Sequence, residues 1–329
     1  MTNHPKLETK EVELTLPANL RTGGAERDTI RHRFADRELD AINAALLAGR
    51  PLLVRGEPGV GKSQLARAAA QGLGRVFVSK VIDARTEARD LLYTFDAVRR
   101  LADAQTLNAR GITEAKAVEQ ALAELRYVQP GPLWWAFDWD GARQPTDGAE
   151  NTPPEQSDEA DPGNGAVVLL DELDKADSSV PNGLLEALGQ GAFDGPGGLR
   201  VESRSTPPLV VVTTNEERAL PDAFLRRCLV LHLKVPTKRT ELLTWLEHRA
   251  RGHFDESQIA NSILRQAAEQ LADDRGEILR RGLAPPGSAE FLDLLRVLVR
   301  ATVDSDSQQQ LLDQVSEFVL RKHPEDPEG

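Results

Sequence analysis

The stretch Gly56-Glu57-Pro58-Gly59-Val60-Gly61-Lys62-Ser63 decides how this sequence folds. It matches the pattern G-x-x-x-x-G-K-S, in which glycines allow backbone N–H groups to point at bound phosphates. The apolar run 51–55 before it predicts a buried strand, and residues 62–71 after it contain strong helix formers. In this context we expect a nucleotide-binding loop, not a structural turn, with Lys62 reaching the β- and γ-phosphates and Ser63 binding Mg²⁺.

A second apolar run, residues 166–170, predicts another buried strand, and two adjacent carboxylates follow it. Asp171 is expected to hold the magnesium ion, through water, and Glu172 to orient or deprotonate the attacking water. Alone, such a pair would be read as solvated acids at a strand end. Together with the phosphate loop it predicts the catalytic part of a nucleotide hydrolase, because the magnesium ion needs such a carboxylate.

Two further motifs follow the next predicted strand, residues 209–213. Asn215 ends that strand at the edge of the sheet where ligands bind, so its side chain can bridge the γ-phosphate and the attacking water, although such an Asn is otherwise a turn former. The segment 220–228 predicts a short helix that ends in Arg226 and Arg227. We expect this pair, Arg227 foremost, to face the nucleotide of a neighbouring subunit; surface ion pairs or a helix cap are the alternative.

The order of predicted elements indicates an α/β fold with a helical C-terminus. Strands are expected at 51–55, 76–82, 166–170, 209–213 and 229–235, and their continuous apolar runs suit a parallel sheet. We predict an N-terminal arm (1–30), an ATPase core (31–235) and a helical lid domain (236–329). Within the core, we expect a helical insert at about 86–126 and a disordered acidic loop at about 144–165.

Composition narrows the class of protein. The formal charge of the 329 residues is −12, and about −6 without the acidic tract, which argues against a broad nucleic-acid-binding surface. No apolar run approaches the roughly 18 to 20 residues of a membrane span, and no signal peptide is evident, so we expect a cytoplasmic protein. The single Cys228 agrees with that. The six histidines show no zinc-ligand spacing, and the tryptophans near residue 135 are expected to be core residues.

Three motifs together, at 56–63, 170–177 and 220–228, resemble the MoxR family of AAA+ ATPases, and the likeness covers about 33–303. The resemblance implies ATP and Mg²⁺ as cofactors, a sheet ordered 5-1-4-3-2, a helical lid and a ring, usually a hexamer. It implies that Asn215 is the sensor-1 residue. MoxR proteins are chaperone-like ATPases that activate partner complexes, often with a von Willebrand factor A domain protein, so such a partner is expected here.

The lid departs from the family pattern. Many relatives carry a sensor-2 arginine at the start of a lid helix, where this sequence has Glu290. Arg280 and Arg281, just upstream, are the candidates to replace it.

Two other functions stay open at this stage. Ring ATPases with this kind of insert include helicases, so a nucleic-acid motor or loader is one alternative, although the charge and the lack of a basic stripe oppose it. A switch whose nucleotide state sets its assembly is the other. Glu172 and Asn215 favour real turnover over such a switch.

Overall fold

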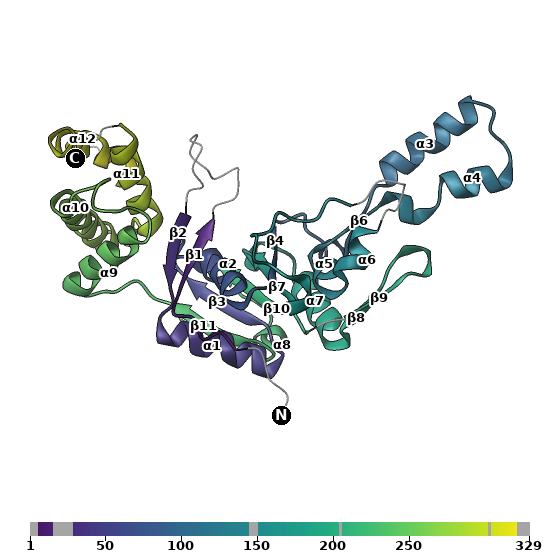
Figure 1. Cartoon of the computed structure of the whole chain (residues 1–329), viewed down its shortest axis with the longest axis horizontal. Helices are drawn as coiled ribbons and strands as arrows, with labels where there is room; N and C mark the ends of the chain where they lie inside the picture. The colour runs from purple at the N-terminus through teal and green to yellow at the C-terminus, as the bar shows by residue number, and fades with distance from the viewer. Residues whose placement is uncertain (1–5, 16–28, 145–150, 204–205, 302–303, 321–329) are drawn as a thin grey trace. The chain divides into compact units, whose positions relative to one another are not determined.

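The computed structural model describes residues 6–15, 29–144, 151–203, 206–301 and 304–320 (Figure 1). The chain forms two compact units, which we describe separately. The first comprises Met1–Lys10, Phe34–Val54 and Leu65–Leu231, and the second Glu11–Arg33, Arg55–Gln64 and His232–Gly329. The predicted phosphate loop therefore belongs to the same unit as the C-terminal helices.

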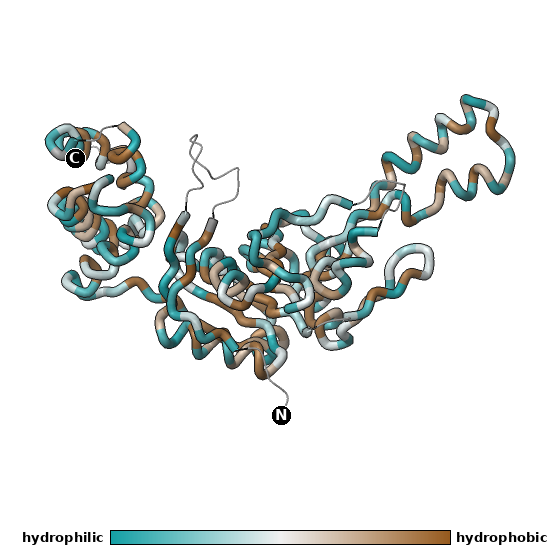
Figure 2. The backbone as a smooth tube through the Cα atoms, in the orientation of Figure 1, coloured by the Kyte–Doolittle hydropathy of each residue, from teal (hydrophilic) through white to brown (hydrophobic). Residues whose placement is uncertain are grey.

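The central sheet has five strands: β3 (Leu52–Gly56), β4 (Val76–Val81), β7 (Ala166–Asp171), β10 (Leu209–Thr214) and β11 (Leu229–Leu233). Their order is β11-β3-β10-β7-β4, which is the predicted 5-1-4-3-2. β7 pairs in parallel with both β4 and β10. Every side chain of β10 is buried, as are the first five of β7, because both faces of the sheet are covered; these strands are strongly hydrophobic in Figure 2.

The first unit contains the helices that precede β11. They are α1 (Asp36–Ala48), most of α2 (Lys62–Leu73), α3 (Ala97–Ala109), α4 (Ala115–Ala121), α5 (Pro132–Phe137), α6 (Trp139–Arg143), α7 (Ser179–Gln190) and α8 (Asp222–Leu225). Short 3-10 helices are η2 (Ala88–Leu91), η3 (Glu124–Tyr127), η4 (Pro162–Asn164), η5 (Leu173–Lys175) and η6 (Pro196–Gly198), and short hairpin strands are β5 (Tyr93–Phe95), β6 (Val128–Pro130), β8 (Ala192–Asp194) and β9 (Arg200–Glu202).

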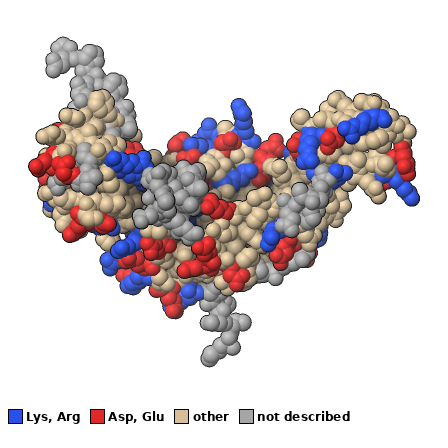
Figure 3. All heavy atoms as spheres, turned by 45° about the horizontal axis from the view of Figure 1, so that its top comes forward, with Lys and Arg blue, Asp and Glu red and all other residues tan. Residues whose placement is uncertain are grey.

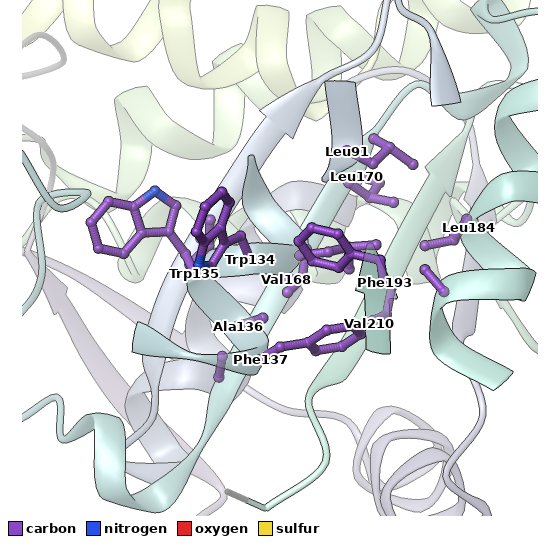
Figure 4. Packing of buried hydrophobic residues seen from close by; sticks show 14 of the residues in the cluster. Leu91, Trp134, Trp135, Ala136, Phe137, Val168, Leu170, Leu184, Phe193 and Val210 are labelled. Atoms are coloured by element: carbon purple, nitrogen blue, oxygen red, sulfur yellow. The ribbon is translucent and has the colours of Figure 1, made fainter. Parts of the chain in front are cut away.

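The aromatic part of the core lies where α5 packs against β4 and β7. Trp134 and Trp135 are almost fully buried, as the sequence predicts. Phe193 of β8 meets Trp134 edge-on with a centroid distance of 6.0 Å, and the ring of Phe137 lies 6.3 Å away (Figure 4). This cluster fixes the β8–β9 hairpin to the body of the unit.

The predicted helical insert contains more than helices. β5 and β6 pair antiparallel at its base, and α3 and α4 extend from that base, away from the sheet (Figure 1). Neither helix has a buried residue. The side chain of Asp96 accepts a hydrogen bond from the N–H of Arg99 and caps the start of α3, so this helix begins about ten residues later than its apolar pattern suggests.

The acidic stretch is ordered where the structure describes it, although its composition predicts disorder. Gln156 makes two hydrogen bonds with the backbone of Phe77 in β4, donating to its carbonyl and accepting from its N–H. Glu159 accepts a hydrogen bond from Gln71 of α2. The side-chain amide of Gln156 thus pairs with the edge strand β4, and both residues attach the acidic stretch to the rest of the unit. Residues 145–150 of the predicted loop lie outside the described residues.

The second unit contains α9 (Arg239–Arg251), α10 (Asn261–Arg280), α11 (Ser288–Ala301) and α12 (Ser305–Leu320), which pack on one another around a hydrophobic core. We call them the helical bundle. The predicted N-terminal arm adds an antiparallel hairpin, β1 (Glu11–Thr15) and β2 (Thr29–Arg33), to this unit. The N–H of Arg31 donates to the carbonyl of Gly252 at the end of α9. Among the described residues, no helix is both long and apolar enough to cross a membrane.

Candidate functional site

The phosphate loop, Gly56–Ser63, connects the end of β3 to the start of α2. Gly59 and Gly61 have φ angles of +73° and +101°, which side chains rarely allow, so the glycines of the motif are required by the backbone. The Nζ of Lys62 donates to the carbonyls of Gly56 and Glu57 at 2.8 and 3.0 Å. Lys62 is buried and folded back on the loop. Its ammonium group thus lies at the loop, where the motif places the phosphates.

Asp171 and Glu172 end β7, and the hydroxyl of Thr213 in the neighbouring strand β10 joins them. Thr213 donates a short hydrogen bond to Oδ1 of Asp171 and accepts one of 2.9 Å from the N–H of Glu172. Thr213 is fully buried. Sequence reasoning missed this residue, although a hydroxyl within the apolar run of β10 was a visible signal.

Asn215 follows β10 and reaches Glu172, as the sequence predicts for side chains at neighbouring strand ends. Its Nδ2 donates to Oε1 of Glu172 at 3.3 Å. The Nζ of Lys175 in η5 donates to the other carboxylate oxygen at 2.7 Å. The ion pair with Glu172 raises the pKa of Lys175. The structure thus brings Asp171, Glu172 and Asn215 together, and it adds Thr213 and Lys175.

The backbone is strained at two places in this cluster. Glu172 and Glu216 are the non-glycine residues with positive φ in the described part of the chain, at +62° and +63°. The left-handed conformation costs a residue with a side chain about 1–2 kcal/mol. Two partly buried hydrogen bonds, from the N–H of Glu172 to the hydroxyl of Thr213 and from the N–H of Glu217 to Asp174, help to hold these turns. Strain of this kind collects at functional sites.

Arg226 and Arg227 follow α8 and are both exposed. Nη1 of Arg227 donates to the carbonyl of Ala223 at 3.4 Å, which is a local contact within the same turn. Their predicted action on the nucleotide of a neighbouring subunit stays a prediction. Their exposure is compatible with it.

The lid residues singled out by the sequence, Glu290, Arg280 and Arg281, lie in or next to α10 and α11. Glu290 accepts a hydrogen bond from the N–H of Gly287 and caps α11. Arg280 donates to the carbonyl of Gly276 in its own helix, and Arg281 ends α10. Besides Arg249, whose guanidinium lies close to Gly61, an arginine that reaches the loop is Arg275, whose guanidinium contacts Glu57. No local sequence pattern distinguishes it.

The residues present fit a magnesium nucleotide. Mg²⁺ prefers oxygen ligands and is usually held by one or two protein groups together with phosphates and water. Asp171 supplies a carboxylate and Ser63, in the first turn of α2, supplies a hydroxyl. In the described residues, no group of three or more His, Cys, Asp and Glu side chains forms a different kind of metal site. Lys and Arg side chains are interspersed with Asp and Glu on the face shown in Figure 3.

The chain was also compared with proteins of known structure and with curated sequences. Many chains of known structure match; among them is a provisionally assigned ATPase from Cytophaga hutchinsonii, at 14% identity. The match covers 86% of this chain and 79% of that one, with a TM-score of 0.38. No curated protein matches the sequence.

The family comparison gives the clearer result. The model of the AAA domain (dynein-related subfamily) matches residues 51–228, which is more than half of the chain. The matched part begins just before the phosphate loop and includes Asp171, Glu172, Asn215 and both arginines. This chain therefore belongs to the AAA domain family, in its dynein-related subfamily.

Proposed function

We propose that this protein hydrolyses ATP and uses the energy to remodel or activate a partner protein. Family membership implies ATP binding. The observation that supports hydrolysis is the carboxylate of Glu172, which Asn215 and Lys175 hold at the end of β7, beside Asp171. When bound, the magnesium ion neutralises charge on the phosphates. Asp171 and Ser63 would hold it, Lys62 would contact the β- and γ-phosphates, and Glu172 would accept a proton from the attacking water.

Two variants test the chemistry. Lys62→Ala should abolish nucleotide binding, whereas Glu172→Gln should bind ATP normally and lower turnover at least a hundredfold, because an amide cannot accept the proton. ADP binding is measured by calorimetry and turnover by phosphate release, both with Mg²⁺. Near wild-type turnover of Glu172→Gln would rule out its assigned role. Failure of the wild-type protein to bind ATP would refute the proposal itself.

We further propose a MoxR-like role in a ring, usually a hexamer, that acts on a protein client such as a von Willebrand factor A domain protein. The motifs at 56–63, 170–177 and 220–228 support this role. Purification from the native cell with Glu172→Gln, which should hold ATP and the assembled state, tests it. Recovery of the same client with Glu172→Gln and not with Lys62→Ala is expected. Equal recovery with both variants would contradict an ATP-dependent interaction.

A nucleic-acid motor or an assembly switch is the alternative to this role. Filter binding with single- and double-stranded DNA distinguishes the first, since a motor should bind tightly and lose affinity with salt. A switch should bind ATP and change its assembly with hardly any turnover. The net charge of −12 and the mixed charges in Figure 3 oppose the motor.

A further inference from the structure

A buried arginine of the helical bundle is paired with the phosphate loop. Arg275 of α10 is only 6% exposed, and its Nη2 lies 2.8 and 2.7 Å from the two carboxylate oxygens of Glu57. Its Nη1 donates to the carbonyl of Pro286 at 3.0 Å. A buried guanidinium needs an opposite charge nearby. Glu57, the second residue of the loop, supplies it.

The loop touches the bundle at a second point. The hydroxyl of Ser288, at the start of α11, donates to the carbonyl of Gly59 at 2.6 Å. A Cβ atom on Gly59 would come within 2.6 Å of the Cβ of Ala289, so no side chain fits between them. Hydrogen bonding and close packing therefore hold the middle of the loop against α11.

Glu57 connects this contact to the phosphate-binding group. Its side chain binds Arg275, while its carbonyl accepts a hydrogen bond of 3.0 Å from Nζ of Lys62. A shift of Glu57 would therefore move an acceptor of Lys62 as well. The loop's amides and Lys62 depend on the same short backbone segment.

We propose that Arg275 is a positioning residue of the phosphate loop, and that its ion pair with Glu57 makes nucleotide affinity depend on the helical bundle. The inference rests on the proposed function, since it requires nucleotide at this loop. Arg275 reaches the loop through Glu57 and needs no contact with the nucleotide. The pair acts mainly on binding, because Glu57 lies in the loop that would hold the phosphates shared by ADP and ATP.

The test is a double-mutant cycle with Glu57→Gln, Arg275→Gln and the double variant. ADP, which is not hydrolysed, is titrated with Mg²⁺, and steady-state ATP turnover gives kcat and KM. Each single variant should bind ADP about tenfold more weakly and raise KM similarly, with kcat within about threefold of wild type. The double variant should bind no more weakly than the worse single variant. The charge exchange Glu57→Arg with Arg275→Glu should recover part of the affinity.

Arg239→Gln is the matched control. Arg239 of α9 pairs at the surface with Asp273 of α10, the helix that also carries Arg275. It should leave the Kd of ADP unchanged. A purely structural role of Arg275 would lower the melting temperature and the active fraction without raising the Kd. If Arg275→Gln does not fold, the more exposed Glu57→Gln decides alone.

The possible failures are distinct. Wild-type affinity in Glu57→Gln overturns the inference and leaves the proposed function intact. A wild-type protein that binds ADP no better than Lys62→Ala overturns the proposed function, and the inference with it.

Discussion

The ammonium group of Lys175 lies 2.7 Å from Oε2 of Glu172, in an ion pair that is partly open to solvent. Lys175 and Asn215 hold opposite oxygens of the same carboxylate. Orientation of Glu172 is thus shared between a charged and a neutral donor. The two donors come from different chain segments, η5 and the end of β10.

Replacement of Lys175 by Ala should lower kcat by no more than about fivefold, because a solvent-exposed ion pair contributes little and Asn215 still holds the other oxygen of the carboxylate. The pKa of Lys175 is raised, chiefly by its hydrogen bond with Glu172, so the side chain stays protonated well above neutral pH. The ratio of wild-type to variant kcat should therefore be constant from pH 7 to 9. A ratio that changes in this range would show that Lys175 loses its proton there. Lys238→Ala, in an exposed ion pair of α9, is the control.

Thr213→Val should lower kcat at least tenfold with little loss of ADP affinity. Valine has nearly the same shape, but it removes the hydroxyl that binds both Asp171 and the N–H of Glu172. Phosphate release at several Mg²⁺ concentrations measures the effect, and more Mg²⁺ should be needed for half-maximal rate. The surface variant Thr244→Val, in α9, should behave as wild type. Equal activity of Thr213→Val and wild type would show that the hydroxyl is dispensable.

Arg227→Ala should abolish turnover and leave nucleotide binding intact, since the arginine is expected to act across a subunit boundary. Mixing Arg227→Ala with Lys62→Ala subunits tests this. Mixed assemblies contain interfaces with an intact loop on one subunit and an intact arginine on the other, so activity should return in part. No recovery at any mixing ratio would count against action in trans. Arg226→Ala, tested in the same way, shows which arginine of the pair is required.

Two histidines of the second unit should make its stability depend on pH. Burial, and secondarily the charge of Arg249, lowers the pKa of His32 to about 4; burial and then Arg296, Arg249 and His32 lower that of His253 to about 4. Both are neutral in the folded protein and take up protons more readily when unfolded. The free energy of unfolding should therefore fall as the pH drops from 6.5 to 4, by on the order of 3 kcal/mol for each histidine.

Denaturant unfolding at several pH values measures this dependence. The double variant His32→Gln and His253→Gln should show a flatter profile than wild type between pH 6.5 and 4. His248→Gln, at an exposed position of α9, is the control. Identical slopes for wild type and the double variant would contradict the lowered pKa values.

Phe193→Ala should destabilise the first unit by about 3–5 kcal/mol, because it opens a cavity in a packed aromatic cluster. Phe193 is 5% exposed and contacts both Trp134 and Phe137. Thermal unfolding followed by tryptophan fluorescence reports on it directly. Phe318, which is 76% exposed, gives the control variant Phe318→Ala, with an expected change within about 0.5 kcal/mol. A comparable loss in both variants would refute the packing argument.

The sequence predicted the parts of the fold that are encoded by contiguous residues. The phosphate loop is a single eight-residue motif, and β7 and β10 are continuous apolar runs whose ends place Glu172 beside Asn215. Arg275 and Glu57 are 218 residues apart, so no local period reveals their contact. The helices of the insert were harder to bound, because α3 and α4 have no buried residue that would fix their ends.

Disorder was predicted for the acidic stretch on composition alone. Composition indicates how much apolar surface a segment can bury. It does not predict specific hydrogen bonds, such as those that the side-chain amide of Gln156 makes with the edge strand of the sheet. Lys175 was missed for a related reason. A lysine three residues after a glutamate is common, and its orientation depends on the short turn η5 between them.

The left-handed backbone at Glu172 implies a conflict between the stability of the protein and its activity. Glycine adopts this conformation without cost, so Glu172→Gly would relieve local strain while deleting the carboxylate. A laboratory selection for heat resistance alone would favour such losses, and a selection for turnover would restore them. In such an experiment, loss of the glutamate would indicate selection for stability, and its retention would indicate selection for turnover.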